Sequence, residues 1–323
     1  MYKPEIDGVT QSLLIKKREC PVKCRAHLKG LFLPGNSDAL IYGNVFHEYQ
    51  DVVLTLVQSK EINSWEYFQD KNNMRKVTAE VYKRFEKEIE ESELKFKDSY
   101  MQTFEIMKYL IPLYFRFWQN DFSGKEKKTI YEVEKIFKVP FAGSFLRGKR
   151  DFVFSQRSAD NLYLSDHKTK SRIEENLLSM LIPRDFQVLF YMLAYYLEYG
   201  KKLKGVLYNI VRKTSLRRKV SEGIEQFAKR IASDIESRPE FYFIRYHVDI
   251  QWKNVALFSL KLGREIKEFI EWYNNPECKD IPYTNNCSTK FGSCEFLEYC
   301  DSNFQSKEYL SKGELFKELK ERK

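Results

Sequence analysis

Three consecutive segments with alternating apolar and polar side chains constrain the fold of this chain more than any other feature. They cover residues 129–141, 146–154 and 161–166. Alternation with a period of two is typical of strands that bury one face. A glycine separates the first two segments, and a polar Ser-Ala-Asp-Asn sequence separates the last two. The pattern therefore predicts three consecutive strands of one sheet.

Helical periodicity surrounds these strands. Residues 61–122 are rich in Glu, Lys and aromatic side chains at helical spacing, which predicts a helical insertion. We find neither an internal repeat nor a low-complexity linker, so residues 1–323 are expected to form a single domain. Later patterns predict helices over 173–200, 222–237 and 254–273 and strands over 204–212 and 241–252. The expected fold class is α/β, a mixed sheet core flanked by helices, with helical segments toward both ends.

The charge of the chain indicates the class of partner. Lys and Arg number 55 against 46 Asp and Glu, which gives a net charge of +9. A basic balance favours polyanions, and nucleic acid is the commonest of them. Basic residues gather at 147–150, before Asp151, and at 212–219. We expect both groups to contact phosphates, with Arg147 and Arg217 as candidate substrate-binding residues.

The N-terminal region lacks the apolar segment of a secretory signal, and the apolar run at 109–117 contains Pro112 and is too short to span a bilayer. We therefore expect a cytoplasmic protein that is not in a membrane. The chain has six cysteines, and in a reducing compartment metal or cluster ligation is a commoner use of cysteine than a disulfide.

Carboxylates and a lysine gather where the second and third predicted strands end. Asp151 and Asp166 would lie on neighbouring strands, so their carboxylates can bind one hard cation. Lys168 follows on the same strand face by the period of two. A divalent cation there can activate a water, and an ammonium group can position it or stabilise developing charge. His47 would add a nitrogen ligand, which favours Mn²⁺ over Mg²⁺ without excluding either.

Three cysteines form a compact group in a hydrophilic segment. They are Cys287, Cys294 and Cys300, and they lie in the cysteine-rich region 278–300. A tetrahedral zinc site or a cubane cluster requires four thiolates. The candidates for the fourth thiolate are Cys20, Cys24 and Cys278.

The polar motifs resemble the RecB-like branch of the PD-(D/E)xK nuclease superfamily in kind and in order. That branch has a helical Gly-x-x-x-His, a strand ending in Gly-x-x-Asp, a strand ending in Asp/Glu-x-Lys-Thr, and a helical Gln-x-x-x-Tyr. The corresponding residues here are Gly43 and His47, Gly148 and Asp151, Asp166 to Thr169, and Gln187 and Tyr191. The resemblance covers most of the chain from about residue 11 to residue 300.

The resemblance implies a role for each of these residues. His47, Asp151 and Asp166 would bind the metal together with the backbone carbonyl of His167, and Asp151, Asp166 and Lys168 would be catalytic. Gln187 and Tyr191 would contact the DNA backbone. On the preceding strand, Glu134 or its rival Glu132 stands where some members place an additional acidic residue.

In iron-sulfur members of this branch, one cysteine precedes the histidine motif and three follow the nuclease core. The upstream cysteine commonly stands in a Cys-Pro pair, which favours Cys20, with Cys24 as the alternative. The resemblance implies a structural [4Fe-4S] cluster that closes the N-terminal and C-terminal segments over the core. Zinc is the alternative for the same four thiolates.

The expected activity is that of a metal-dependent DNA nuclease, an exonuclease that acts on single-stranded ends. It resembles stand-alone phage-encoded or CRISPR-associated members of the branch. Two alternatives are a CRISPR-adaptation-type nuclease and a non-catalytic DNA-binding module of nuclease fold with a zinc site. The sequence identifies no protein partner.

Overall fold

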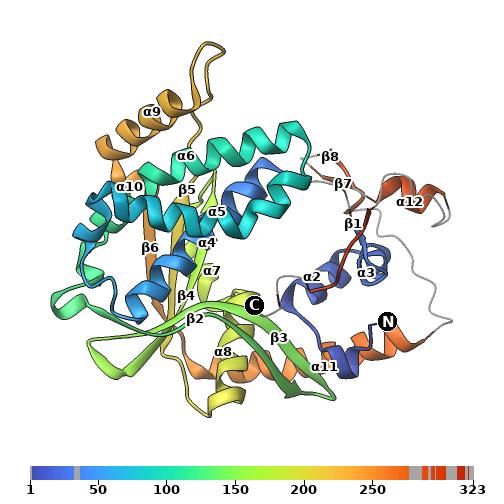
Figure 1. Ribbon diagram of the computed structural model, residues 1–323. Helices are drawn as coiled ribbons and strands as arrows, with labels where there is room; N and C mark the ends of the chain where they lie inside the picture. Colours follow the sequence, from blue (N-terminus) through green and yellow to red (C-terminus); the bar gives the residue numbers. More distant parts are fainter. Residues whose placement is uncertain are drawn as a thin grey trace.

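The centre of the fold is a five-stranded mixed sheet with the order β2-β3-β4-β5-β6 (Figure 1). The computed structural model describes residues 2–32, 37–275, 286–289, 292–294, 296–302, 311–316 and 319. The strands are β2 (Lys128–Phe141), β3 (Ser144–Gln156), β4 (Ser158–Lys170), β5 (Gly205–Arg212) and β6 (Phe243–Asp249). Strands β4 and β5 run parallel, and the other neighbours are antiparallel. The three strands predicted first from the sequence are present and longer than expected.

The connections follow from strand direction. Strands β2 and β3 join through a tight turn in which Ala142 and Gly143 both have positive φ. Parallel strands require a long crossover, and the chain between β4 and β5 supplies α7 (Glu175–Leu181), the 3₁₀ turn η4 (Ile182–Arg184) and α8 (Phe186–Tyr199). Helix α8 thereby packs against the sheet next to the strands that carry Asp151 and Asp166.

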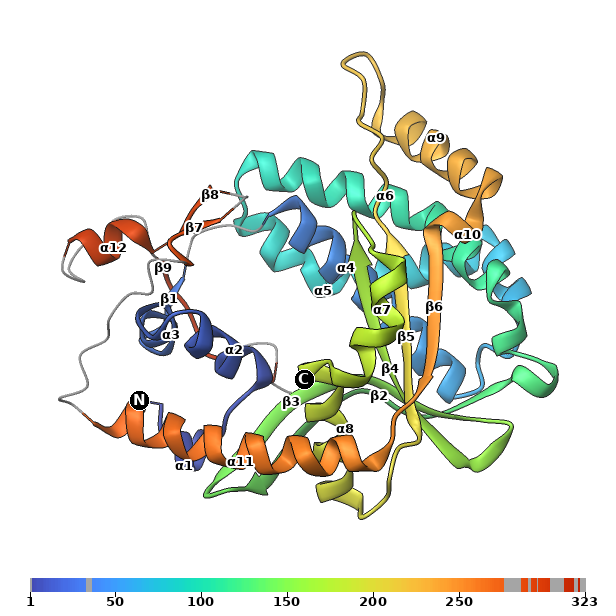
Figure 2. The same ribbon diagram turned by 180° about the vertical axis from the view of Figure 1, so that it is seen from behind.

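Helices cover both faces of the sheet (Figures 1 and 2). On one face, Val153 and Leu164 share a core with α8, α11 (Trp252–Asn274), α2 (Gln11–Glu19) and α3 (Pro21–Leu28), and α1 (Pro4–Asp7) contacts β3. On the other face, Phe152 and Leu207 pack with Leu54 of α4 (Asp38–Gln58). Helix α4 in turn shares a core with α5 (Lys71–Glu91), α6 (Leu94–Phe117) and α9 (Ile224–Ser237).

Two sequence predictions of element type were partly wrong. Residues 173–200 do not form one helix, because Pro183 stands in the short turn η4 and Asp185 begins α8 by accepting a hydrogen bond from the Val188 amide at 3.0 Å. The strand predicted over 241–252 is β6 alone. It is preceded by α10 (Pro239–Tyr242), which has proline in its first turn.

Small elements bring the two chain ends together. Strand β1 (Leu31–Phe32) pairs with β9 (Ser311–Lys312), and β7 (Ser288–Thr289) pairs with β8 (Gly292–Ser293). Helix α12 (Leu297–Asp301) packs beside α3 through Phe296 and Tyr299. The remaining short turns are η1 (Trp65–Gln69), η2 (Gln119–Asp121) and η3 (Gly124–Glu126).

One helical stretch, Glu175–Tyr199, is long and apolar enough to span a membrane by length and composition alone. Its most apolar window is 44% buried, and α8 belongs to the core behind the sheet. A core helix passes the same test, so this stretch is weak evidence for a membrane.

Candidate active site

Asp151 and Asp166 lie where the pairing of β3 with β4 ends. The last pair on this side is Phe152 with Ser165, so each aspartate is the next residue beyond it. The Asp151 carboxylate accepts a hydrogen bond from the backbone N–H of His167 at 2.7 Å, which ties the two strand ends together. The sequence prediction that these carboxylates come from neighbouring strands is confirmed.

Helix α4 brings His47 to the same point. Its Nδ1 lies 3.8 Å from Oδ2 of Asp151. Burial lowers the pKa of His47 below its ordinary value, so the ring is neutral near pH 7 and can offer a nitrogen lone pair to a metal. A Cβ on Gly43 would lie 3.2 Å from the Thr169 hydroxyl, so the glycine allows α4 to approach β4 closely.

Glu134 joins His47 and Asp151 in a compact set of possible ligands. One ligand atom from each residue lies within 4.8 Å of the other two. Glu134 has a positive φ of 47° in the middle of β2, between the pairs Val133–Phe152 and Lys135–Arg150. Left-handed backbone is costly for a residue with a side chain and concentrates at functional sites. This conformation places Glu134 in the site and leaves it ion-paired with Lys149.

The structure separates Glu134 from its rival Glu132. Glu132 accepts a hydrogen bond at 3.0 Å from Nε of Arg150, whose guanidinium is fully buried and also contacts Glu198 at 2.7 Å. Arg150 therefore holds β3 to β2 and α8 inside the protein. The expectation that Arg150 contacts phosphate was wrong, because its side chain is 0% exposed.

The buried carboxylates fit a divalent cation. Burial raises the pKa of Glu134 to about 8 and that of Asp166 to about 7, and the charge of Asp151 adds to both shifts. Burial also acts to raise the pKa of Asp151, but its interactions with His47, His167 and Lys168, together with the hydrogen bond from the His167 backbone N–H, lower it overall. Among the described residues, the buried Oδ2 of Asp166 has no well-aligned hydrogen-bond donor, although Nζ of Lys168 lies 2.9 Å from it. A bound cation would compensate this concentrated negative charge.

Lys168 lies between Asp166 and Gln187. Its Nζ donates to Oδ1 of Asp166 at 2.9 Å and to Oε1 of Gln187 at 2.7 Å. Burial acts to lower the pKa of Lys168, but Asp166 and Asp151 raise it overall, so the amine is charged. Nε2 of Gln187 then donates to the Tyr191 hydroxyl at 3.3 Å. The two residues thus contact the site on one face of α8, as their spacing predicted.

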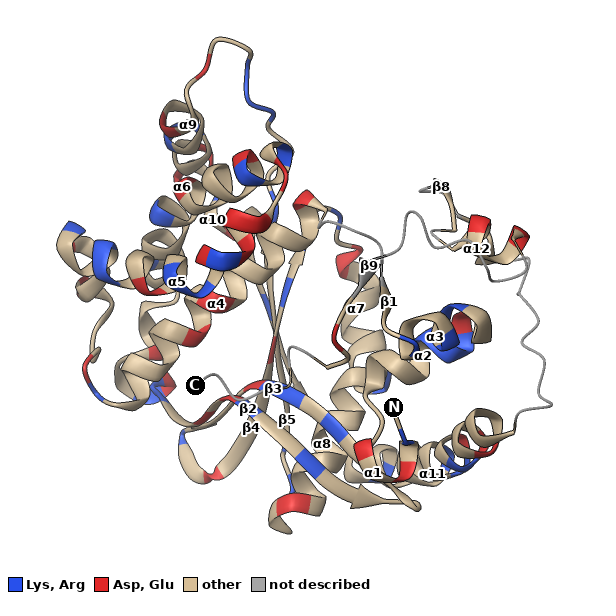
Figure 3. Ribbon diagram, turned by 45° about the vertical axis from the view of Figure 1, so that its right-hand side comes forward, with Lys and Arg blue, Asp and Glu red and all other residues tan. Residues whose placement is uncertain are grey.

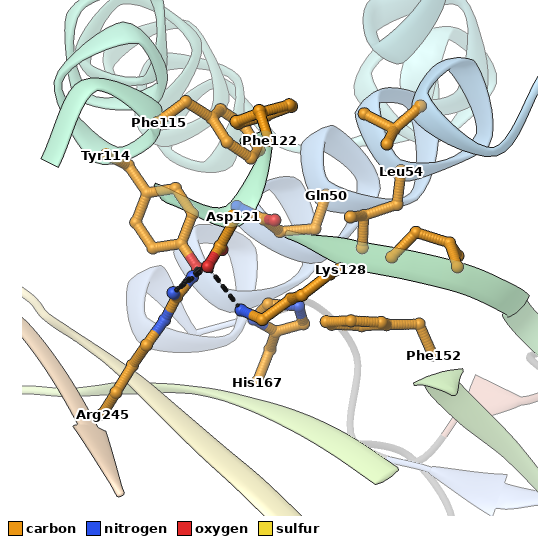
Figure 4. A pocket seen from close by; sticks show the side chains of 12 residues that line it. Gln50, Leu54, Tyr114, Phe115, Asp121, Phe122, Lys128, Phe152, His167 and Arg245 are labelled. Atoms are coloured by element: carbon orange, nitrogen blue, oxygen red, sulfur yellow. Dashed lines mark hydrogen bonds and ion pairs between the residues drawn. The ribbon is translucent and has the colours of Figure 1, made fainter. Parts of the chain in front are cut away.

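A buried polar network lies behind the imidazole of His167, and Figure 4 shows its Lys128, Asp121 and Arg245 side chains. Nδ1 of His167 lies 2.6 Å from Nδ2 of Asn209, and Oδ1 of Asn209 accepts from Nε of Arg245 at 2.9 Å. Arg245 and Lys128 both pair with Asp121, at 2.9 and 2.8 Å. Asp121, Lys128 and Arg245 line a small cavity of about 30 Å³ beside the His167 ring. No feature of the sequence marked Asn209, Arg245 or Asp121, which come from three distant segments.

A family comparison agrees with this geometry. The model of the PD-(D/E)XK nuclease superfamily matches residues 10–301. This chain belongs to the PD-(D/E)XK nuclease superfamily. No curated protein matches the chain. Membership makes this protein a nuclease of a superfamily that uses Mg²⁺ or Mn²⁺ and acts on DNA, and the mixed sheet with flanking helices is consistent with that fold.

The structure places the four favoured cysteines of this PD-(D/E)XK protein together. Cys20 shares an apolar cluster with Cys294 and Cys300, and the Cys294 backbone N–H donates to the Cys287 carbonyl at 2.7 Å. Burial raises the pKa of Cys287, and the neighbouring Cys294 and Cys20 add to the shift. Cys24 points elsewhere: it is fully buried in the core behind the sheet, with Sγ 3.7 Å from the Leu13 carbonyl. Cys278 lies outside the described residues.

The two candidate basic residues are not near the nuclease carboxylates. Arg147 donates to the Asp7 carbonyl at 3.2 Å and stacks on Phe316 at 4.7 Å, so it joins the chain ends to β3. Arg217 is exposed on the loop between β5 and α9, which projects at the top of Figure 1. Figure 3 shows Lys and Arg along β3 and this loop.

Proposed function

We propose that this protein is a DNA exonuclease of the RecB-like branch that hydrolyses phosphodiester bonds at single-stranded ends with Mg²⁺ or Mn²⁺. One observation carries the proposal: His47, Glu134 and Asp151 converge beside a charged lysine that bridges Asp166 and Gln187. A histidine and carboxylates provide the metal ligands, and the lysine provides the fixed positive charge that phosphodiester hydrolysis requires.

Each side chain has a defined task in this proposal. His47, Asp151, Glu134 and Asp166, with the His167 carbonyl, hold the metal, which polarises the scissile phosphate and makes a bound water more acidic. Lys168 positions the attacking water and stabilises negative charge that develops on the phosphate. Gln187 fixes Lys168 through its 2.7 Å hydrogen bond and, with Tyr191, faces the DNA backbone.

We also propose that Cys20, Cys287, Cys294 and Cys300 ligate a structural [4Fe-4S] cluster, with zinc as the alternative. Burial and the three neighbouring cysteines raise the pKa of Cys300 to about 11, so this thiol resists ionisation without a metal. Metal ligation removes that repulsion, because a coordinated thiol is deprotonated. The Phe296 amide donates to Sγ of Cys294 at 3.4 Å, a hydrogen bond suited to a cluster-ligating sulfur.

Contacts of the helical region 61–122 with the site support a proposal about domain organisation. We propose a single cytoplasmic nuclease domain in which residues 61–122 are a helical insertion that supports the site. Tyr114 of α6 accepts hydrogen bonds from Asn209 and Arg245, and Asp121 pairs with Arg245. The insertion thus contributes to the network behind His167.

The decisive experiment compares two single-stranded DNAs of the same sequence, one linear and end-labelled and one covalently closed. With Mn²⁺, the linear strand should be degraded and the circle should persist, and chelation with EDTA should stop cleavage. Equal cleavage of both DNAs would show an endonuclease that uses the same metal site. Binding of DNA with no cleavage in Mn²⁺ or Mg²⁺ would instead identify a non-catalytic DNA-binding module.

A further inference from the structure

Helix α7 exposes an unusual number of large apolar side chains. Leu177, Met180 and Leu181 are 49%, 64% and 56% exposed, and the helix has no buried residue. Their spacing of three and four residues places them on one side of the helix. One side of α7 is therefore apolar and exposed, whereas Leu178 on the same helix packs against the core.

The ends of the chain segment that carries α7 are both fixed at the active site. The segment leaves the site after Lys168 and returns to it at Gln187, and these two side chains are hydrogen-bonded at 2.7 Å. Between these two ends, Glu175 at the start of α7 pairs with Arg212 at 2.9 Å. Helix α7 lies beside β4 and β5 in both ribbon views (Figures 1 and 2). The apolar surface therefore lies on a chain segment that begins and ends at residues of the active site.

Positive charge flanks this apolar surface. Lys170 and Arg172 precede α7, and Arg184 follows it and is anchored to the Met180 carbonyl at 2.8 Å. Apolar side chains between basic groups match a strand of nucleic acid whose phosphates and bases are both accessible. In a duplex the base faces are covered by stacking, so only unpaired bases can lie on such a surface.

We propose that Leu177, Met180 and Leu181 form a platform for the bases of the single strand whose phosphodiester is held at the metal site. This inference rests on the proposed function. It adds base-contacting residues that select single strands over duplexes and leaves the hydrolytic residues unchanged. The contacts are apolar, so they are tolerant of base identity.

The test is a binding measurement, which is independent of cleavage. The triple variant Leu177→Ser/Met180→Ser/Leu181→Ser is compared with Leu257→Ser/Leu260→Ser, which removes two leucines of α11 that are 66% and 67% exposed. Fluorescence anisotropy in Ca²⁺ gives the Kd for three labelled DNAs: a single strand, a blunt duplex and a single strand with consecutive abasic sites.

The platform predicts a specific pattern. The α7 variant should bind the single strand at least about tenfold more weakly than wild type, with duplex affinity unchanged, because it removes the apolar contacts that only unpaired bases can make. Wild type should lose a similar factor on the abasic strand, and the α7 variant should lose nothing further. The α11 variant should behave as wild type.

Three results would overturn the inference. They are unchanged single-strand affinity in the α7 variant, equal loss for the duplex, or full wild-type affinity for the abasic strand. A fourth result concerns vesicles of phosphatidylcholine and phosphatidylglycerol. If wild type and the α11 variant bind them and the α7 variant does not, the surface belongs to a membrane-binding site. Cleavage of the linear strand by wild type, measured separately, distinguishes failure of the platform from failure of the nuclease assignment.

Discussion

Nδ2 of Asn209 lies 2.6 Å from Nδ1 of His167, and this contact fixes the imidazole from behind. Arg245 can only donate, so its 2.9 Å bond requires Oδ1 of Asn209 on that side and leaves Nδ2 as the donor to His167. His167 then carries its proton on Nε2, which is buried beside the small cavity and has no hydrogen-bond partner among the residues that the structure describes. The cavity, about 30 Å³, can accommodate one water to accept that proton.

This contact makes Asn209 a positioning residue for the His167 carbonyl. We expect Asn209→Leu to raise the Mn²⁺ concentration for half-maximal cleavage by about 10–100-fold, the usual cost of losing support behind a metal ligand. His167→Ala keeps the backbone carbonyl and should give a similar change, and the double variant should not add to it. A lower melting temperature with unchanged Mn²⁺ dependence would show that Asn209 only stabilises the fold.

Asp166 and Lys168 should be essential for chemistry. We expect Asp166→Ala and Lys168→Ala each to reduce cleavage to background, because the first removes a metal ligand and the second the fixed positive charge beside it. Affinity for DNA and the circular dichroism spectrum should remain close to wild type. Full cleavage by Lys168→Ala at saturating Mn²⁺ would refute its role.

The two glutamates of β2 should differ in their effects. Glu134→Gln should weaken Mn²⁺ binding, measured by calorimetry, with little loss of stability, because it removes a carboxylate from the trio with His47 and Asp151. Glu132→Gln should leave Mn²⁺ binding intact and destabilise the fold by about 1–3 kcal/mol, because buried Arg150 loses a charged partner. If Glu132→Gln weakened Mn²⁺ binding and Glu134→Gln only destabilised the fold, Glu132 would be the metal ligand and Glu134 the structural residue.

The cysteines can be tested by colour and metal content. Protein purified without oxygen should be brown and contain iron and acid-labile sulfide. Cys20→Ser should bleach it, as should Ser at 287, 294 or 300, whereas Cys24→Ser should keep the colour because its thiol packs against Leu13 in the core. If Cys24→Ser bleached the protein and Cys20→Ser did not, the fourth ligand would be Cys24 in place of Cys20. A colourless protein with one zinc per chain would exclude the cluster.

Stability should change with pH through Lys128. Burial and the charge of Arg245 lower its pKa to about 8, against 10.5 as the ordinary value. Between these values the unfolded chain binds more protons than the folded protein, so the contribution of Lys128 to stability increases as the pH rises through this window. The free energy of unfolding of wild type relative to Lys128→Met should therefore increase from about pH 7.5 to pH 10. A constant difference would contradict the lowered pKa.

Local sequence patterns predicted the sheet well and the site in part. Alternation located β2, β3 and β4, and the Gly-x-x-Asp and Asp-x-Lys spacings located Asp151, Asp166 and Lys168. Gly148 illustrates why such spacing is informative: a Cβ there would lie 2.8 Å from the Phe137 ring and 3.2 Å from the Tyr191 ring. The requirement is steric and local, so it is visible in sequence.

The features that the sequence did not reveal depend on distant contacts. The sequence did not separate Glu134 from Glu132, because a strand pattern does not show the left-handed backbone that Glu134 adopts in β2. Asn209, Arg245 and Asp121 meet only because β5, β6 and η2 pack together. Arg150 was misassigned because a basic residue beside Asp151 looks the same in sequence whether it faces solvent or Glu198.

The side-chain hydrogen bond between Lys168 and Gln187 allows the chain segment between them to be replaced by another sequence. Helix α7 has no buried residue, and the segment starts and ends at side chains that are 2.7 Å apart. Apart from Ile173 and Leu178, which pack against the core, residues 171–181 could therefore vary in sequence, or be grafted from another nuclease, while the hydrolytic residues keep their positions. Substrate preference and catalytic chemistry would then evolve on separate stretches of one polypeptide. A library of variants restricted to this segment could alter substrate preference without loss of hydrolysis.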